Sequence, residues 1–255
     1  MRFDVVTLFP EMFAAIIEHG ITRRAHELGL WSLTTWNPRD FTTDAHRTVD
    51  DRPYGGGPGM VMMAEPLAQA VEAARGDGGR ARVVALAPGG RRLTDSMVRQ
   101  WAEQGGAVTI VCGRYEGIDQ RFLDECVDEV VSVGDFVMSG GELAAMALID
   151  AIVRQLPGAL KEASVDEESF ATGLLDGPHY TRPEQWRERA VPQVLVSGRH
   201  RDIEAWRRRE ALRATLGTRP EMIQAAREDG RLTARDEKDL RELAQMGAAE
   251  SESAA

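Results

Sequence analysis

Carboxylates, arginines and histidines gather in two long irregular stretches of this sequence. Residues 37–59 hold arginine, aspartate and histidine side chains and end in the run PYGGGPG. Residues 161–173 are rich in acids and show no apolar periodicity, which predicts a mobile linker. A carboxylate can remove a proton as a general base, and an arginine can stabilise negative charge that develops in a reaction. A loop as long and as polar as the first stretch is usually functional.

Three further loops are rich in glycine, and each follows a short apolar run that predicts a buried strand. The runs are 82–86, 108–112 and 130–133. The loops that follow them are APGGR (87–91), GRYEG (113–117) and GDFVMSGG (134–141). Such exits place flexible backbone at the carboxyl edge of a sheet, where ligands of α/β proteins bind. On pattern alone, a cofactor site and a set of tight turns stay equally open.

The elements that position these loops alternate between strand and helix patterns. This alternation predicts an α/β fold with a mainly parallel sheet for residues 1–160. The segment SGGE (139–142) has the spacing of a capping box, and it precedes an apolar helix over 143–153. Two roles fit Arg154 near the end of that helix: it satisfies the last carbonyl groups, or it takes part in chemistry.

The carboxyl-terminal third has a different character. Residues 161–175 form the predicted linker, 176–246 a smaller all-helical domain, and 247–255 a disordered tail. The whole chain carries a net charge of −10, yet residues 180–219 hold ten arginines and five acids, a balance of +5. Local clustering sets the field that a polyanion meets. This basic segment is therefore either a phosphate-binding surface or a solvated helix face.

Composition and motifs exclude several classes of protein. With 255 residues, 43% hydrophobic and 28% charged, the chain has the content of an ordinary globular protein. Its two cysteines, Cys112 and Cys126, have no cysteine or histidine neighbours, which favours buried thiols in a reducing cytoplasm over a disulfide or metal site. No apolar run is long enough to span a membrane, and the first residues alternate as a strand. The dinucleotide fingerprint, the P-loop and the nucleophile elbow are missing.

Four blocks of the sequence closely resemble the bacterial tRNA (guanine-N1)-methyltransferase family. They are HRTVDDRPYGGGPGM (46–60), VCGRYEGID (111–119), SVGDFVMSGGE (132–142) and LLDGPHYTRPE (174–184). The resemblance is collinear from the first strand to about residue 246. It implies a fold of the SPOUT class, in which the α/β domain carries a trefoil knot. The pattern alone favours an ordinary doubly wound sheet, because knots are nearly absent from folds.

The resemblance also implies partners and a cofactor. The substrate is expected to be tRNA with guanosine at position 37 preceded by another guanosine, and the methyl donor S-adenosylmethionine. The family works as a homodimer with shared active sites, and no membrane is involved. It uses Mg²⁺, but no ligand cluster in this sequence identifies a metal site.

By this resemblance the three glycine loops line the cofactor, largely through backbone groups. Glycine lets the main chain approach a ligand closely, and a carboxylate such as Glu116 suits a neighbouring sulfonium cation. The cofactor-binding residues implied in this way are Leu86, Ala87, Pro88, Gly113, Tyr115, Glu116, Gly117, Val133, Gly134, Asp135, Phe136, Val137, Met138, Gly140 and Gly141.

The resemblance assigns the chemistry as well. N1 of a neutral guanine carries a proton and is a poor nucleophile, so a carboxylate general base must remove that proton. The charge that develops on O6 calls for a cation. Arg154 matches the arginine of the family, and Glu168 stands where the family has the aspartate that acts as base. Asp166 is the competing carboxylate, and mere solubility of the linker is the alternative role for both acids.

The expected contacts with tRNA are spread over the long loop and the helical domain. They are His46, Asp50, Arg52, Gly59, His179, Ser197, His200, Arg207 and Arg208. A second hypothesis is a non-catalytic RNA-binding protein on the same knotted scaffold. The only feature that favours it is Glu168 in place of aspartate.

Overall fold

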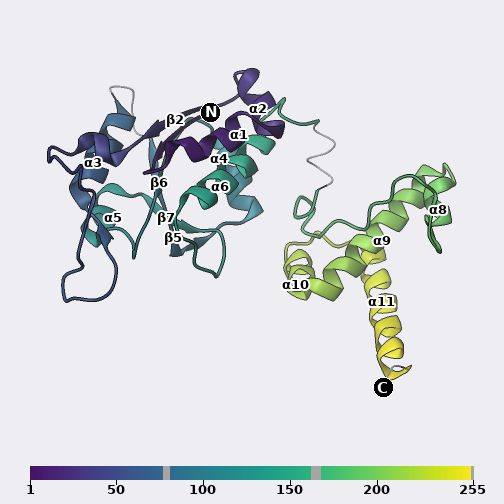
Figure 1. The fold of residues 1–255 in the computed structure, drawn as a ribbon. Coiled ribbons are helices and arrows are strands. Elements are labelled where there is room, and N and C mark those ends of the chain that lie inside the picture. The colour runs from purple at the N-terminus through teal and green to yellow at the C-terminus, as the bar shows by residue number, and fades with distance from the viewer. Residues whose placement is uncertain (77–80, 162–167, 254–255) are drawn as a thin grey trace. The chain divides into compact units, whose positions relative to one another are not determined.

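The computed structural model describes residues 1–76, 81–161 and 168–253, the last seven of these by their backbone only. The chain divides into an amino-terminal unit, Met1–Glu162, and a carboxyl-terminal unit, Ala163–Ala255 (Figure 1). The division falls inside the segment 161–175 for which the sequence predicts a linker. Asp166, the competing catalytic carboxylate, lies outside the described residues.

The amino-terminal unit is built on a five-stranded sheet in which every pair of neighbours is parallel. The strand order is β2-β1-β6-β5-β7, so the first strand lies near the middle. Val5, for example, lies opposite Thr35 on one side and Ile110 on the other. This confirms the predicted α/β fold with a parallel sheet. The strands are β1 (Arg2–Val6), β2 (Ser32–Trp36), β5 (Arg82–Arg92), β6 (Ala107–Cys112) and β7 (Glu129–Ser132).

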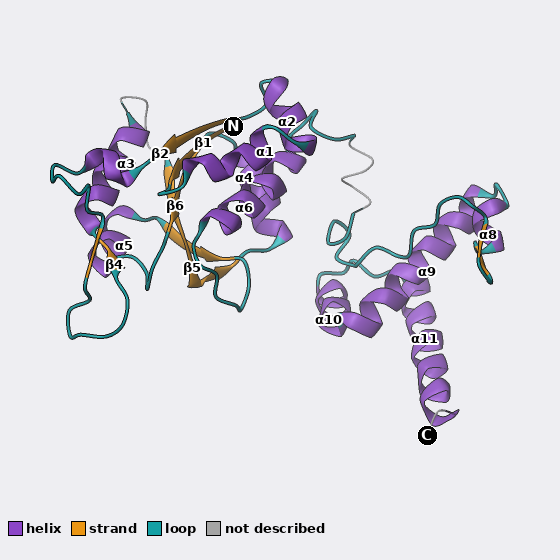
Figure 2. Cartoon of the chain, viewed as in Figure 1, coloured by secondary structure: helices purple, strands orange, loops and turns teal. Residues whose placement is uncertain are grey.

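Helices cover both faces of this sheet, as Figure 2 shows. One core packs the sheet against η1 (Pro10–Phe13), α1 (Ala14–Ile17), α2 (Gly20–Glu27), α4 (Asp95–Gln104) and α6 (Glu142–Gln155). The other core packs it against α3 (Ala64–Arg75) and α5 (Gln120–Cys126). In β5, Val84 and Leu86 join the first core and Val83 and Ala85 the second, because successive side chains of a strand point to opposite faces.

Strand β5 is longer than the sequence predicts. The pattern predicts a strand over 82–86 and a loop over 87–91, whereas the strand continues to Arg92 with a shift of register against β7 between Leu86 and Arg91. Gly90 makes this possible, because a Cβ there would lie 2.5 Å from the backbone nitrogen of Val131. A glycine inside a strand often marks such a close approach of two backbones.

Helix α6 also begins differently from the prediction. Its N-cap is Gly141 and no side chain caps it, so the predicted capping box of Ser139 and Glu142 is wrong. Glu142 is instead fully buried at the first turn of the helix. The predicted apolar face is confirmed, since Ala144, Leu148 and Ile152 are buried four residues apart.

The carboxyl-terminal unit is mainly helical. Its core contains Leu174, Leu212, Ile223, Leu240 and Leu243. A short hairpin, β8 (Gln185–Trp186) with β9 (Arg189–Ala190), precedes α8 (Gln193–Val196), α9 (His200–Thr218), α10 (Pro220–Glu228) and α11 (Ala234–Ser253). Helix α11 extends to Ser253, whereas the sequence predicts a disordered tail from residue 247. None of the helices in the described ranges is both long and apolar enough to cross a lipid bilayer.

The second half of the predicted linker packs against these helices. Leu174 is buried in their core, and the backbone N–H of Leu175 donates to the hydroxyl of Thr215 on α9 at 2.9 Å. The backbone N–H of Asp176 donates to the Ser169 hydroxyl at 2.9 Å. Residues 169–175 therefore belong to the carboxyl-terminal unit, which differs from the mobile linker expected there.

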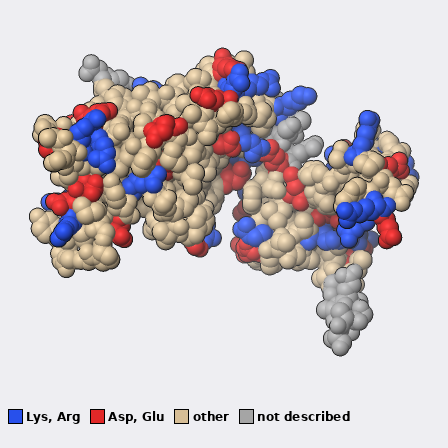
Figure 3. Space-filling view, viewed as in Figure 1, with Lys and Arg blue, Asp and Glu red and all other residues tan. Residues whose placement is uncertain are grey.

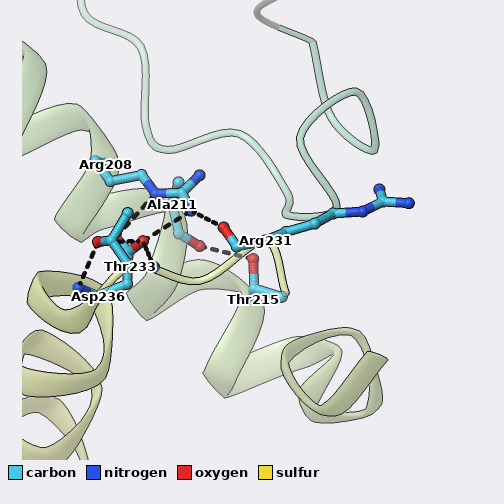
Figure 4. Close-up of polar contacts among 6 residues, drawn as sticks. All are labelled: Arg208, Ala211, Thr215, Arg231, Thr233 and Asp236. Atoms are coloured by element: carbon cyan, nitrogen blue, oxygen red, sulfur yellow. Dashed lines mark hydrogen bonds and ion pairs between the residues drawn. The ribbon is translucent and has the colours of Figure 1, made fainter. Parts of the chain in front are cut away.

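A polar network joins α9 to the start of α11 (Figure 4). Arg208 contacts Asp236 through Nε at 3.0 Å and Nη2 at 3.1 Å. Asp236 also accepts from the backbone N–H and hydroxyl of Thr233, and its own N–H donates to that hydroxyl. Burial acts to raise the pKa of Asp236, but the hydrogen bonds from Arg208 and Thr233 outweigh it and hold the pKa below its ordinary value. The pair therefore fixes the two helices together.

Candidate active site

A cavity of about 310 Å³ opens at the ends of strands β6 and β7 and beside the register shift within β5. All the cofactor contacts expected from the sequence line it, with the exception of Asp135. These lining residues are Leu86, Ala87, Pro88, Gly113, Tyr115, Glu116, Gly117, Val133, Gly134, Phe136, Val137, Met138, Gly140 and Gly141. Three loops that are distant in sequence therefore converge on one space, as the strand exits predict.

The sequence did not predict some of the residues that line the cavity, and one predicted residue, Asp135, does not line it. Asp135 forms an ion pair with Arg92 instead of lining the cavity. Arg114 also lines the cavity. The sequence could have indicated this, because Arg114 lies between Gly113 and Gly117 in a predicted cofactor loop. The remaining unexpected residues are apolar or small: Ile118, Leu123, Val131, Ser132, Ser139 and Ala144.

Two of the loops are held together by backbone contacts. The N–H of Gly141 donates to the carbonyl of Gly113 at 2.9 Å, and Arg114 forms a β-bridge with Gly140. A Cβ at Gly141 would lie 2.8 Å from the Cα of Cys112, a contact that only a shift of backbone could relieve. Glycine is therefore required at residue 141 for the loops to meet.

A buried ion pair lies behind this junction. Arg114 Nε is 2.9 Å from Glu142 Oε2, and the hydroxyl of Thr7 donates to Glu142 Oε1 at 2.9 Å. The Arg114 guanidinium also lies over the ring of Phe9, 4.4 Å from its centroid. Burial raises the pKa of the neighbouring Cys112 thiol well above its ordinary value, and the Glu142 charge adds to this effect. The thiol therefore stays protonated at neutral pH.

The end of the long loop reaches the same cavity. The backbone N–H of Glu116 donates to the carbonyl of Met60 at 3.0 Å, and that of Met62 donates to Gly117 at 2.9 Å. Gly59 lies against the side chain of Glu116, where a Cβ would have no room. The structure thus brings Gly59, a predicted substrate contact, together with the predicted cofactor loop.

Asp50 contacts Tyr115, which lines the cavity. It lies on β3 (Asp50–Asp51), which pairs with β4 (Val61–Met62). Burial raises the pKa of the Tyr115 hydroxyl, and its hydrogen bond to Asp50 raises it further. The side chains of His46 and Arg52, also predicted to contact substrate, are exposed on the same loop.

Neither of the two predicted catalytic residues is among the described residues that line the cavity. Arg154 is half-buried near the end of α6, and Ala144, which lines the cavity, is near its start. Arg154 follows Ala144 by ten residues, which corresponds to about 15 Å along the helix. Glu168 belongs to the carboxyl-terminal unit, where its carbonyl accepts from the N–H of Ala171 at 3.1 Å. The described part of the amino-terminal unit therefore forms the cavity without either residue among its lining.

The carboxyl-terminal unit has a second cavity, of about 520 Å³. His179 and Arg207 line it, together with Tyr180 and Trp206, whose ring centroids are 6.1 Å apart. The other predicted tRNA contacts are not lining residues. Ser197 and His200 lie just before and at the start of α9: the Ser197 hydroxyl donates to the Val194 carbonyl at 2.7 Å, and the His200 side chain is exposed. Arg208 is engaged by Asp236 instead.

The basic segment 180–219 is partly neutralised within its own unit. Besides Arg208, Arg209 pairs with Asp239 and Glu242, and Arg213 pairs with Glu210. Figure 3 accordingly shows basic and acidic side chains side by side on the face drawn. Among the described residues, no carboxylate forms an ion pair with Arg207.

Comparison with known proteins points to one family. A family model described as tRNA (Guanine-1)-methyltransferase TrmD matches residues 1–225. A protein of Janthinobacterium sp. (strain Marseille) is 61% identical over 246 residues, covering 94% of this chain and 98% of that protein. One of Herminiimonas arsenicoxydans is 59% identical over 249 residues, covering 95% and 100%. One of Cupriavidus metallidurans is 57% identical over 250 residues, covering 96% of each. All three are named tRNA (guanine-N(1)-)-methyltransferase.

Proposed function

The chain belongs to the tRNA (guanine-1)-methyltransferase family and is a methyltransferase, and we propose that it transfers the methyl group of S-adenosylmethionine to N1 of guanosine 37 in tRNA. The observation that carries this proposal is the convergence of the three glycine loops on one cavity. Two of these loops lie within two of the four sequence blocks that resemble the family, and the end of a third block, at Gly59, lies against Glu116.

The residues around the cavity fit S-adenosylmethionine. Its walls are largely apolar, and Gly113, Gly140 and Gly141 bring backbone close to the space. Glu116 provides a carboxylate for a cation. The remaining contacts would come from the segments 86–88 and 133–138, without Asp135. When bound, the cofactor supplies an electrophilic methyl group on a sulfonium centre.

The chain's own residues then handle the proton and the charge of guanine. Glu168 accepts the N1 proton, which leaves the N1 lone pair free to attack. Arg154 donates hydrogen bonds to O6, where negative charge develops as that proton leaves. Glu168 carries the same carboxylate as the aspartate of the family, on a side chain longer by one methylene.

We propose that two copies of the chain complete each site. The separation of Arg154 and the cavity along α6 supports this, because Arg154 is not among the described residues that line the cavity. Large apolar side chains are also exposed near the cavity: Phe9 (39%), Val137 (84%) and Leu143 (55%). Exposed apolar groups that lie together mark interaction surfaces. The homodimer and the trefoil knot rest on the family resemblance.

Each unit carries proposed tRNA contacts: the exposed residues of the long loop in the amino-terminal unit, and the second cavity in the carboxyl-terminal unit. Arg207, His179 and the aromatic pair Tyr180 and Trp206 suit phosphates and unstacked bases. The family resemblance also suggests Mg²⁺, yet no group of metal-ligating side chains occurs among the residues that the structure describes. No step is therefore assigned to a metal ion.

A methylation assay tests the proposal. A tRNA transcript with guanosines at positions 36 and 37 should receive one methyl group, at N1 of position 37. A transcript with adenosine at position 37 should receive none, and adenosine at position 36 should make a poor substrate. Binding of tRNA without methyl transfer would support the non-catalytic hypothesis instead, and methylation at another nucleotide would contradict the assigned position.

A further inference from the structure

The cavity wall carries both signs of charge. Among its described lining residues, Arg114 is the cation and Glu116 the anion. Glu116 forms no ion pair with any residue in the described ranges, whereas Arg114 is paired with Glu142. A cation in the cavity would therefore meet one compensated arginine and one uncompensated carboxylate.

Glu142 depends on Arg114 for its own compensation. Its side chain is 1% exposed, and Oε2 has no hydrogen-bond partner among the described residues, so its 2.9 Å ion pair with Arg114 Nε is what compensates its charge. A buried carboxylate without a partner is strongly disfavoured. The two charges are therefore matched across the junction between the loop 113–117 and the start of α6.

The guanidinium of Arg114 is held in one position. Nη1 donates to the carbonyl of Ser139 at 3.2 Å, and Nη2 lies 3.7 Å from the sulfur of Met12. The stack on Phe9 covers one of its faces, and the side chain is 18% exposed. These contacts hold Arg114 in place independently of its pairing with Glu142.

We propose that Glu142 is a specificity-determining residue of the cofactor cavity: by neutralising Arg114, it allows the cavity to accept a cationic ligand. It acts through Arg114, because Glu142 itself does not line the cavity. The inference rests on the proposed use of S-adenosylmethionine, whose sulfonium carries a positive charge. The product, S-adenosylhomocysteine, lacks both the methyl group and that charge.

This role predicts a change in preference between the two molecules. Glu142→Gln keeps an oxygen for the Thr7 hydroxyl and nearly the same volume, but it leaves the Arg114 charge uncompensated. The uncompensated cation in the cavity wall should repel the sulfonium. An uncompensated unit charge in the cavity wall should weaken binding of S-adenosylmethionine about tenfold. The affinity for S-adenosylhomocysteine should change by less than about twofold, since its sulfur is neutral.

Calorimetry on the full chain, with S-adenosylmethionine and S-adenosylhomocysteine as separate titrants, measures this ratio. The double variant Glu142→Gln with Arg114→Gln removes both charges and should return the ratio to the parental value. It also keeps the test decisive if the single variant does not fold. Glu129→Gln, which breaks the Arg91–Glu129 pair away from the cavity lining, is the matched control and should leave both affinities unchanged.

The outcomes separate the inference from the function on which it rests. If Glu142→Gln weakens both molecules equally, Glu142 has only a structural role and the inference is wrong. A double variant that still disfavours S-adenosylmethionine overturns it as well. If the parental chain binds neither molecule, the proposed cofactor is wrong, whatever the variants do.

Discussion

Gly59 lies against the carboxylate side chain of Glu116, so closely that a Cβ at residue 59 would overlap it. The φ angle of Gly59, +80°, is also one that other residues rarely adopt. This contact joins the end of the long polar loop to the wall of the cavity. The position of the loop and the shape of the cavity are therefore linked at Gly59, beside the backbone hydrogen bonds of Met60 and Met62 to the same cavity loop.

Gly59→Ala should separate the loop from the cavity. The left-handed backbone alone costs about 1–2 kcal/mol for a residue with a Cβ, and the overlap with Glu116 adds to this. Hydrogen exchange should quicken at the amides of Glu116 and Met62, which bond across the junction. Gly55→Ala is the matched control, because Gly55 has φ +85° and open space around it. Equal effects of the two variants would show that the Glu116 contact is unimportant.

Gly141→Ala should impair cofactor binding. The added Cβ would meet the Cα of Cys112 at 2.8 Å and push apart the two loops that line the cavity. We expect the affinity for S-adenosylmethionine to fall about tenfold or more, because a backbone shift of this kind alters several contacts at once. Gly89→Ala, where a Cβ has open space, should bind like the parental chain in calorimetry. Unchanged affinity in Gly141→Ala would remove this junction from the site.

Glu168→Gln should slow the methyl-transfer step by about two to four orders of magnitude, the usual contribution of a general base. The amide keeps the size and hydrogen bonding of the side chain but cannot accept the N1 proton. Glu168→Asp should retain more activity than the amide, because it keeps the carboxylate. Single-turnover methylation of tRNA against pH measures these rates.

Asp166→Asn is the control for this prediction and should be nearly silent. Affinities for tRNA and cofactor should barely change in any of the three variants, since the loss is confined to the transition state. If Asp166→Asn is crippled while Glu168→Gln is active, the base is Asp166.

Subunits with different defects should complement each other. In a mixture of Gly141→Ala and Glu168→Gln chains, a mixed dimer combines the intact cavity of one chain with the intact carboxylate of its partner. With random pairing, half of the dimers are mixed and each has one working site, so about a quarter of the parental activity should return. If the mixture has only the summed activity of the two variants measured separately, each chain forms a complete site on its own.

The Arg208–Asp236 pair should stabilise the carboxyl-terminal unit in a pH-dependent way. The pKa of Asp236 is held below its ordinary value. Its stabilising effect is therefore complete above the ordinary aspartate pKa, near 3.8, and is lost as pH falls through the lower folded value. Asp236→Asn should lower the free energy of unfolding at pH 7 by about 2 kcal/mol, as for hydrogen bonds to charged groups.

Asp202→Asn is the matched control for Asp236→Asn, since it breaks the exposed pair with Arg199. It should cost less than about 0.5 kcal/mol, because exposed ion pairs contribute little. Urea unfolding between pH 3 and pH 7 compares the two. If Asp236→Asn shows the same loss at both ends of this range, the charge of Asp236 is not the stabilising feature.

The local patterns of the sequence predict the parallel sheet and the three loops that form the cavity. Alternation of apolar runs and helices is enough for this, because parallel strands end at a common edge. Leu86, Gly113 and Gly141 were expected at one site for that reason, and they line one cavity or support its junction. The ligand of these loops could be inferred only from the family resemblance, because glycine-rich loops are equally typical of tight turns.

Contacts between distant residues could not be predicted from pattern. The spacing of Ser139 and Glu142 indicated a local cap, but Glu142 pairs with Thr7, 135 residues away, and with Arg114. Arg208 was likewise expected on a surface for tRNA because its neighbours are arginines. Asp236 lies 28 residues further on, and only the packing of α9 and α11 brings the two together.

The pairing of the arginines on α9 has a consequence for how a polyanion would bind. Each lysine or arginine that newly contacts a phosphate releases counterions from the nucleic acid, and the affinity then falls as ionic strength rises. Arg208, Arg209 and Arg213 already have carboxylate partners, so a phosphate would have to compete with these for the same guanidinium groups. The dependence of tRNA affinity on ionic strength should therefore be much shallower than ten arginines in residues 180–219 would suggest. Selection of tRNA by this unit then relies more on shape and stacking than on long-range attraction.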